Sequence, residues 1–335
     1  MQPNESAFIK KDKKKTKKNQ KKKNRANILK KMENAHNESN QTTVEDFIPC
    51  SAIGLDGKQM VFLFAINVAI CFSAILENIL ILVAFRKVSS LHPPSKLLFE
   101  CLAFTDLGVG LLHQPLHIAS FTLHKNAKTC SYIKLASWIV AVTFCGVSLL
   151  TLAVVSVDRL LALTLKLRYR QVVTLRRTKF IIATLWVGSS ASGLVALYNG
   201  RISFMISFLG TMTFITISTF CYITIFIKLF HHQAQIQGQV LNAQHNNVGN
   251  QLNISRYRKT VSSVLFVQLT LVVCYTPFGV ERGFIATNRH VSSFAAQIAW
   301  SLVALNSALN PIIYFWKMRE VRHAARKLTE QLCWP

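Results

Sequence analysis

The amino-acid sequence predicts an all-α membrane protein in which seven helices cross the bilayer as a bundle. The 335 residues are 51% hydrophobic and only 16% charged, with a mean hydropathy of +0.31. This composition is too apolar for an ordinary soluble domain. A helix needs about 20 apolar residues to span a membrane. Seven stretches are long enough, at residues 60–86, 95–121, 132–163, 178–198, 202–230, 259–284 and 292–316.

The basic residues of the loops orient these spans. The segments after spans one, three, five and seven hold 18 Lys or Arg residues, and the loops on the other side hold six. Positive charge stays in the cytoplasm, so we expect the N-terminus outside the cell and the C-terminus inside. The chain then divides into a disordered extracellular tail (1–59), a seven-span domain (60–316) and a cytoplasmic amphipathic helix with a tail (317–335).

The N-terminal tail has two parts of different composition. Residues 1–31 are Lys-rich, and a run of like charges predicts disorder rather than a packed domain. No apolar signal region follows Met1, so span one is expected to direct insertion. Two acceptor sequons follow, and they predict glycosylation of Asn37 and Asn40.

Polar side chains interrupt spans two, three and seven. Asp106 sits near the middle of span two, where an acidic residue is rare and usually functional. Ser148 lies 11 residues, or three helical turns, before Arg159 in span three, at a depth where we expect it to face Asp106. Span seven holds Asn306, Ser307, Asn310, Pro311 and Tyr314. Proline frees a backbone carbonyl, which neighbouring helices or water must then satisfy.

Four motifs occur in the order seen in rhodopsin-like G-protein-coupled receptors, and over residues 60–330 the chain resembles this family. Asn310-Pro311-Ile312-Ile313-Tyr314 resembles the family's Asn-Pro-x-x-Tyr. The other three are Leu102-Ala103-Phe104-Thr105-Asp106-Leu107, Asp158-Arg159-Leu160 in place of Asp-Arg-Tyr, and Cys274-Tyr275-Thr276-Pro277 in place of Cys-Trp-x-Pro. A short loop at 198–201 without cysteine, and no proline inside span five, are similar to the melanocortin, lysolipid, cannabinoid and adenosine receptor group.

The resemblance implies a plasma-membrane receptor that passes the signal of an extracellular ligand to a heterotrimeric G protein, with arrestin as a further partner. It implies no catalysis and no cofactor apart from an allosteric sodium ion at Asp106, in a pocket with Ser148, Asn306, Ser307 and Asn310. It assigns activation and G-protein coupling to Asp158, Arg159, Tyr222, Tyr275, Pro277, Pro311 and Tyr314.

The ligand class stays open among peptide, nucleoside and lipid. Ala141 stands where relatives that bind amines carry an aspartate, and Ala304 stands where opsins carry a lysine. We therefore expect neither a biogenic amine bound through that salt bridge nor covalent retinal. Membrane lipid is an expected partner and nucleic acid is not.

Three cysteines carry specific expectations. Cys50 and Cys130 are the two that precede or connect spans on the extracellular side, so they are the available extracellular disulfide. Cys333 follows the amphipathic helix and is a candidate for palmitoylation.

Two other classes of protein have seven spans and are the alternatives. A membrane hydrolase would need a cluster of His and acidic residues, and only His113 and His117, four residues apart, hint at one. A transporter would show internal repeats or broken helices, and no repeat is evident. Ligand-stimulated nucleotide exchange on a G protein separates a receptor from both.

Overall fold

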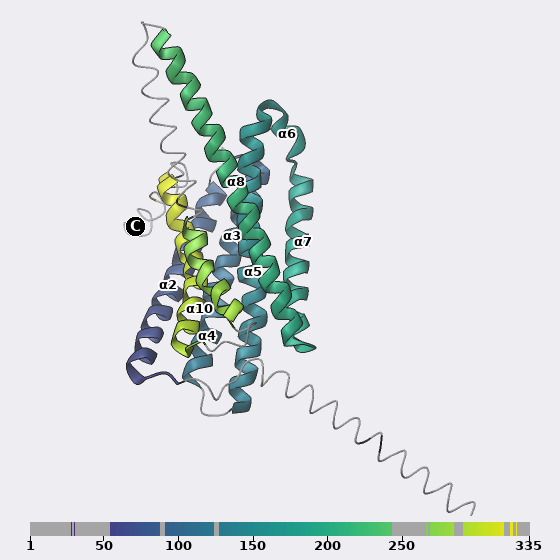
Figure 1. The fold of residues 1–335 in the computed structure, drawn as a ribbon, viewed down its shortest axis with the longest axis vertical. Coiled ribbons are helices and arrows are strands. Elements are labelled where there is room, and N and C mark those ends of the chain that lie inside the picture. Colours follow the sequence, from purple (N-terminus) through teal and green to yellow (C-terminus); the bar gives the residue numbers. More distant parts are fainter. Residues whose placement is uncertain are drawn as a thin grey trace, which may run out of the picture.

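The computed structural model describes residues 54–87, 91–123, 127–242, 269–284 and 291–317, together with Ile28, Lys30, Phe266, Arg322, His323 and Arg326. This part of the chain is a bundle of long helices (Figure 1). The long helices are α2 (Gly57–Lys87), α3 (Pro93–Gly108), α4 (Gln114–Thr122), α5 (Ala127–Leu165), α7 (Leu175–Leu194), α8 (Gly200–Asn242) and α10 (Ser293–Lys317). Residues 269–284 are also helical. The prediction of an all-α bundle is confirmed.

The described helices agree with the predicted spans. Four of them are long and apolar enough to cross a membrane, over Gly57–Lys87, Thr129–Leu165, Leu175–Leu197 and Ile202–His231. Between α5 and α7 the chain forms a 3-10 turn (Lys166–Arg168) and the short helix α6 (Tyr169–Val172). After α7, a second 3-10 turn (Val195–Leu197) leads into α8.

The second span contains a π-helical turn, Val109–His113, between α3 and α4. Pro115 lies in the first turn of α4, where its missing N–H cannot continue the hydrogen-bond pattern of the preceding helix. A single π turn accommodates such an interruption without ending the helix, and π turns are frequent at functional sites. This turn lies on the side of Asp106 away from Arg159, in the outer half of the span.

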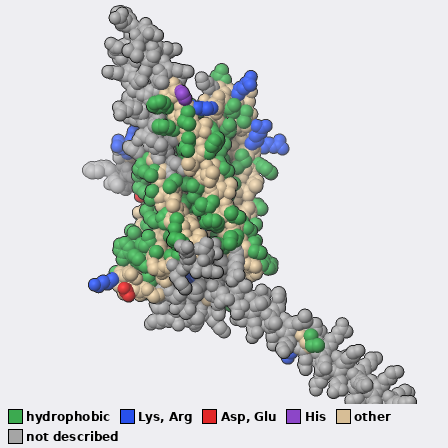
Figure 2. All heavy atoms as spheres, in the orientation of Figure 1, with side chains coloured by type: hydrophobic (Ala, Val, Ile, Leu, Met, Phe, Trp, Pro, Cys, Tyr) green, Lys and Arg blue, Asp and Glu red, His purple; other side chains and the backbone are tan. Residues whose placement is uncertain are grey.

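The outer surface of the bundle suits contact with lipid. Large apolar side chains are exposed along the helices, for example Phe180, Val187 and Phe220, which are 75%, 71% and 66% exposed. Figure 2 shows hydrophobic side chains along the sides of the helices and Lys and Arg side chains gathered toward the end where α6 lies in Figure 1. That end carries the loops with the larger basic content, which we expect to be cytoplasmic.

The interior combines an apolar core with polar ties between helices. Phe85, Leu102, Leu152 and Leu271 are among the buried apolar residues that join α2, α3, α5 and residues 269–284. Asn67 of α2 and Ser301 of α10 exchange hydrogen bonds of 2.9 and 3.1 Å. Nearer the cytoplasmic end, Asn78 Nδ2 donates to the Ser307 carbonyl at 3.0 Å. Because buried polar groups need partners, these bonds fix α10 against α2.

Candidate functional site

The centre of the bundle holds a buried carboxylate with partners from two other helices. Asp106 of α3 is fully buried. Ser148 Oγ of α5 donates to Asp106 Oδ1 at 2.8 Å, and Asn310 Nδ2 of α10 donates to Asp106 Oδ2 at 2.7 Å. The Ser307 side chain is a third hydrogen-bond partner. The structure thus brings together four of the five residues of the predicted sodium pocket.

Asn306, the fifth residue, lies one turn above Asn310 and is also buried. Its Nδ2 has no hydrogen-bond partner among the described residues. An unpaired buried amide costs free energy, so this position retains the capacity to bind a water molecule or a rearranged neighbour. The Asp106 network is therefore polar, enclosed and only partly satisfied.

A second polar cluster lies at the cytoplasmic end of α5, around Asp158. Asp158 is 4% exposed. Tyr169 of α6 donates from its hydroxyl to Asp158 Oδ1 at 2.7 Å, and Ser95 of α3 donates to Oδ2 at 3.0 Å. Burial raises the pKa of Tyr169, and the hydrogen bond to Asp158 raises this pKa further, so the phenol keeps its proton.

Arg159 is held much less tightly than its neighbour Asp158. Its Nε lies 3.9 Å from Asp158 Oδ2, and its side chain is 42% exposed. The guanidinium stands 5.3 Å from the centre of the Phe99 ring. Tyr222 of α8 is buried nearby, with Ser156 as a hydrogen-bond partner. Arg159 is thus free to contact another protein at this end of the bundle.

Ser95 and Tyr169 were not singled out by the sequence. Ser95 begins the second span and Tyr169 lies in the loop after the third. Neither belongs to a spaced motif. Their contact with Asp158 arises because the turn Lys166–Arg168 and α6 pack against α5, which places the Tyr169 hydroxyl beside Asp158 and 3.1 Å from Ser95 Oγ. The position of that loop follows from packing rather than from local pattern.

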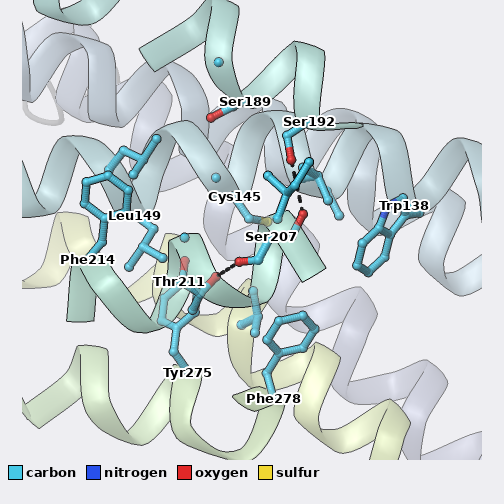
Figure 3. Close-up of a pocket in the computed structure, with 18 of the residues that line it drawn as sticks. Trp138, Cys145, Leu149, Ser189, Ser192, Ser207, Thr211, Phe214, Tyr275 and Phe278 are labelled. Atoms are coloured by element: carbon cyan, nitrogen blue, oxygen red, sulfur yellow. Dashed lines mark hydrogen bonds between the residues drawn. The ribbon is translucent and has the colours of Figure 1, made fainter. Parts of the chain in front are cut away.

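A cavity of about 190 Å³ lies in the half of the bundle away from Asp158 and Arg159. It is enclosed by α5, α7, α8, residues 269–284 and α10. Tyr275 and Phe278 line it opposite Ser192 and Ser207, which lie on the α7 and α8 side (Figure 3). Tyr275 is buried and Pro277 is partly buried two residues later. Both of these predicted switch residues therefore lie at or beside the wall of the cavity.

The cavity and the Asp106 network are separated by a single helical turn. Cys145 of α5 and Val303 of α10 line the cavity. Ser148 follows Cys145 by three residues, and Asn306 and Ser307 follow Val303 by three and four. Residues three and four apart are neighbours on a helix surface. A change in the cavity wall is thus adjacent to the partners of the buried carboxylate.

Arg282 is enclosed by aromatic rings beside the cavity. Its guanidinium lies 5.5, 5.1, 4.9 and 5.3 Å from the ring centres of Trp138, Phe204, Phe278 and Trp300. Its Nε lies 3.1 Å from Glu281 Oε2, an ion pair without the alignment of a hydrogen bond. Cation–π contacts of this kind stabilise a guanidinium that has lost its water.

His113 and His117 are stacked with ring centres 5.6 Å apart, and both are buried. Ser137 Oγ lies 3.5 Å from His113 Nδ1. Within the described residues there is no group of three His, Cys, Asp or Glu side chains that could hold a metal. This part of the chain therefore offers no hydrolase-type metal cluster around the two histidines.

Several predicted residues lie outside what the structure describes. Pro311 is inside α10, but the side chain of Tyr314 is not described. Cys130 is buried and disulfide-bonded. Five other described cysteines form no disulfide: Cys71, Cys101, Cys145, Cys221 and Cys274. Outside the described residues lie Asn37, Asn40, Cys50, Cys333 and most of the predicted amphipathic helix.

Comparison with known proteins gives a family match and several distant relatives. Residues 77–314 match the family described as "7 transmembrane receptor (rhodopsin family)". Melanocortin receptor 5 of Mus musculus is 24% identical over 272 residues, covering 76% of this chain and 80% of that receptor. Adenosine receptor A3 of Bos taurus is 23% identical over 283 residues, covering 77% of this chain and 86% of that receptor.

Proposed function

Because the chain belongs to the rhodopsin family of seven-transmembrane receptors, we propose that its ligand acts on the cavity beside Tyr275 and that the Asp106 network relays the change to Arg159. The family match confirms the predicted class: a multi-pass receptor of the plasma membrane that couples an extracellular ligand to a G protein, and not an enzyme. The proposal concerns which residues carry the signal.

One observation carries the proposal: Asp106 accepts hydrogen bonds from side chains of both α5 and α10. These two helices also form part of the cavity wall, one turn away. Ser148 and Asn310 reach the two carboxylate oxygens of Asp106 at 2.8 and 2.7 Å. Any displacement of α5 against α10 changes at least one of these bonds. A buried carboxylate that loses a charge-assisted hydrogen bond loses about 1.5–3 kcal/mol. That is enough to shift a two-state equilibrium more than tenfold.

The same residues fit a sodium ion. The Asp106 carboxylate and the Ser148 hydroxyl supply the oxygen ligands that small hard cations prefer. A sodium ion would supply positive charge to a carboxylate that has hydrogen-bond donors but no basic partner within the described residues. Asp106, Ser148, Asn306, Ser307 and Asn310 would hold it. We propose that sodium stabilises the arrangement in which α5 and α10 both engage Asp106.

At the cytoplasmic end, the proposal assigns the transducer contact to Arg159, Tyr222 and Tyr314. Arg159 is 42% exposed, whereas its neighbour Asp158 is buried and accepts hydrogen bonds from Ser95 and Tyr169. We assign the heterotrimeric G protein to this face, with arrestin as a second partner at the same face. Glycosylation at Asn37 and Asn40, palmitoylation at Cys333 and membrane lipid contacts complete the proposal.

The two relatives are named as receptors for melanocortin and for adenosine, melanocortin receptor 5 and adenosine receptor A3. At 23–24% identity these names do not choose a ligand for this chain. Peptide, nucleoside and lipid all stay candidates.

The test is nucleotide exchange on purified G proteins by the full-length receptor in lipid nanodiscs. A panel of G-protein α subunits replaces the unknown coupling partner, and a library of peptides, nucleosides and lipids replaces the unknown ligand. At least one pair should give exchange above receptor-free nanodiscs, and Asp106→Ala should reduce the response without loss of folded receptor. An undiminished response in that variant would refute the assigned route.

A further inference from the structure

The wall of the cavity is apolar and uncharged. None of the described residues that form it is acidic or basic. Besides the Cys145 thiol and the indole N–H groups of Trp138 and Trp300, its polar side-chain groups are hydroxyls, from Ser189, Ser192, Ser207, Thr211 and Tyr275. A buried charge without a partner is very costly. An ionised ligand in this cavity would meet no opposite charge, whereas an uncharged ligand would meet apolar surface and hydroxyl groups.

We propose that the cavity binds a neutral amphiphile dissolved in the membrane, which enters sideways from the bilayer between α7 and α8. Such a ligand has an apolar body and an uncharged hydroxyl, ester or amide group. The inference of binding depends on the cavity alone. Only the inference that binding changes G-protein activation rests on the function proposed above.

Aromatic side chains separate the charged pair Arg282–Glu281 from the cavity. Trp138, Phe278 and Trp300 line the cavity on one side and surround the guanidinium on the other. Arg282 is already paired with Glu281 at 3.1 Å. The rings thus separate an occupied ion pair from the cavity, and they place a layer of aromatic side chains at its outer end.

Surface-exposed residues of α7 and α8 take part in the cavity wall. Gly188 of α7 lines the cavity and is exposed, and Ile206 of α8 lines it and is 45% exposed. A Cβ atom added at Gly188 or at Gly210 would meet nothing within 4 Å. In a bundle surrounded by lipid, exposed residues at this depth face acyl chains. The cavity therefore communicates with the bilayer through the space between these two helices.

The hydroxyl groups near that opening have unused hydrogen-bonding capacity. Ser192 Oγ and Ser207 Oγ are 3.4 Å apart, and Thr211 Oγ1 donates to the Ser207 carbonyl at 2.8 Å (Figure 3). A hydroxyl group offers one donor and two acceptor sites, so a single long contact leaves Ser192 and Ser207 able to bind a ligand. These groups suit an uncharged hydroxyl or carbonyl group.

The cavity is large enough to hold only part of a ligand of lipid length. Pockets that enclose drug-sized ligands have volumes of about 300–1,000 Å³, and this cavity has about 190 Å³. A ligand of lipid length would leave part of its chain outside. An opening to the bilayer allows this, because the remaining methylene groups stay in hydrocarbon.

The experiment uses full-length receptor in phosphatidylcholine nanodiscs and a monoacylglycerol that carries a photoreactive diazirine. After irradiation, mass spectrometry should find the probe on the cavity-lining residues of α7 and α8, and unlabelled monoacylglycerol should compete. Gly188→Phe should slow labelling severalfold by filling the opening. Val187→Phe is the matched control, because Val187 is adjacent and 71% exposed but does not line the cavity. Ser207→Ala should weaken the saturable component about three- to tenfold, as expected for the loss of one hydrogen bond.

Three results would contradict the proposal. One is labelling that does not saturate, or that Val187→Phe and Gly188→Phe reduce equally, which would show only contact with bulk lipid. Another is G-protein activation by a water-soluble peptide or nucleoside with a rate that Gly188→Phe leaves unchanged. In that case the receptor function would stand and lateral entry would fail. A probe with an ionised carboxylate that labels the cavity better than monoacylglycerol would also contradict the charge argument.

Discussion

Asn310 Nδ2 lies 2.7 Å from Asp106 Oδ2, so the amide directly before Pro311 holds the buried carboxylate of α3. This bond joins α10 to α3 at the point where proline removes a backbone donor from α10. The helix is therefore tied to the core by a side chain where its own backbone is weakest. A small rotation of α10 would break the hydrogen bond between Asn310 and Asp106 while the apolar packing around α10 is retained.

The first prediction concerns sodium. Replacing potassium by sodium should lower the ligand-free nucleotide exchange of the wild-type receptor, because sodium favours the arrangement in which Asp106 is fully engaged. Asp106→Asn keeps the size of the side chain but removes its charge, so this effect should disappear. Asp56→Asn makes the same chemical change at an exposed position and is the control. A normal sodium response in Asp106→Asn would eliminate the site.

The second prediction concerns the basal activity set by Asp158 and Arg159. No acidic residue occurs between positions 201 and 280, so the foot of span six offers Arg159 no acidic partner. We therefore expect measurable signalling without ligand. In Tyr169→Phe, the lost 2.7 Å hydrogen bond leaves Asp158 available to Arg159, and basal exchange should fall severalfold at equal surface expression. Tyr132→Phe, at a side chain 73% exposed, should have no effect.

These two clusters differ in how far the sequence could predict them. Asp106, Ser307 and Asn310 stand in or beside motifs that resemble those of the family, and Ser148 lies three helical turns before Arg159. The resemblance therefore implied that these four side chains meet. The contact of Tyr169 with Asp158 depends on how a short loop folds back, which local pattern does not specify.

The cavity and the enclosure of Arg282 depend on packing in the same way. Trp138, Phe204, Phe278 and Trp300 come from four separate segments. In the sequence each is one more aromatic residue in an apolar span. Their common contact with Arg282 follows from the relative rotation of the helices. The π turn at Val109–His113 could have been suspected from Pro115, but not located.

The third prediction concerns packing at Gly108. A Cβ atom there would lie 2.2 Å from the ring of Phe144, so Gly108→Ala forces this ring out of its packed position between α3 and α5. Overpacking costs about 1–3 kcal/mol, and alanine returns about 1 kcal/mol through helix propensity. The expected net result is a lower melting temperature in nanodiscs. Gly188→Ala meets open space and should leave the melting temperature unchanged or higher. Equal melting temperatures for the two variants would contradict this packing.

The last prediction concerns the disulfide of Cys130. Five of the eight cysteines are free, and Cys130 is disulfide-bonded, which leaves Cys50 and Cys333 as possible partners. The predicted topology places Cys333 in the reducing cytoplasm and Cys50 outside, where disulfides persist. We therefore expect a Cys50–Cys130 bridge that fastens the N-terminal tail beside the outer end of α4, where the sulfur of Cys130 lies 3.8 Å from the Ser120 carbonyl.

Peptide mapping of surface-expressed receptor without reduction should recover the Cys50–Cys130 pair, and reduction should release both peptides. Cys50→Ser and Cys130→Ser should each lower the melting temperature, and the double variant should be no worse than either single variant, because both remove the same bond. Cys333→Ser is the control and should leave the pair intact. Two free thiols at Cys50 and Cys130, or additive losses in the double variant, would show that the tail is not held in this way.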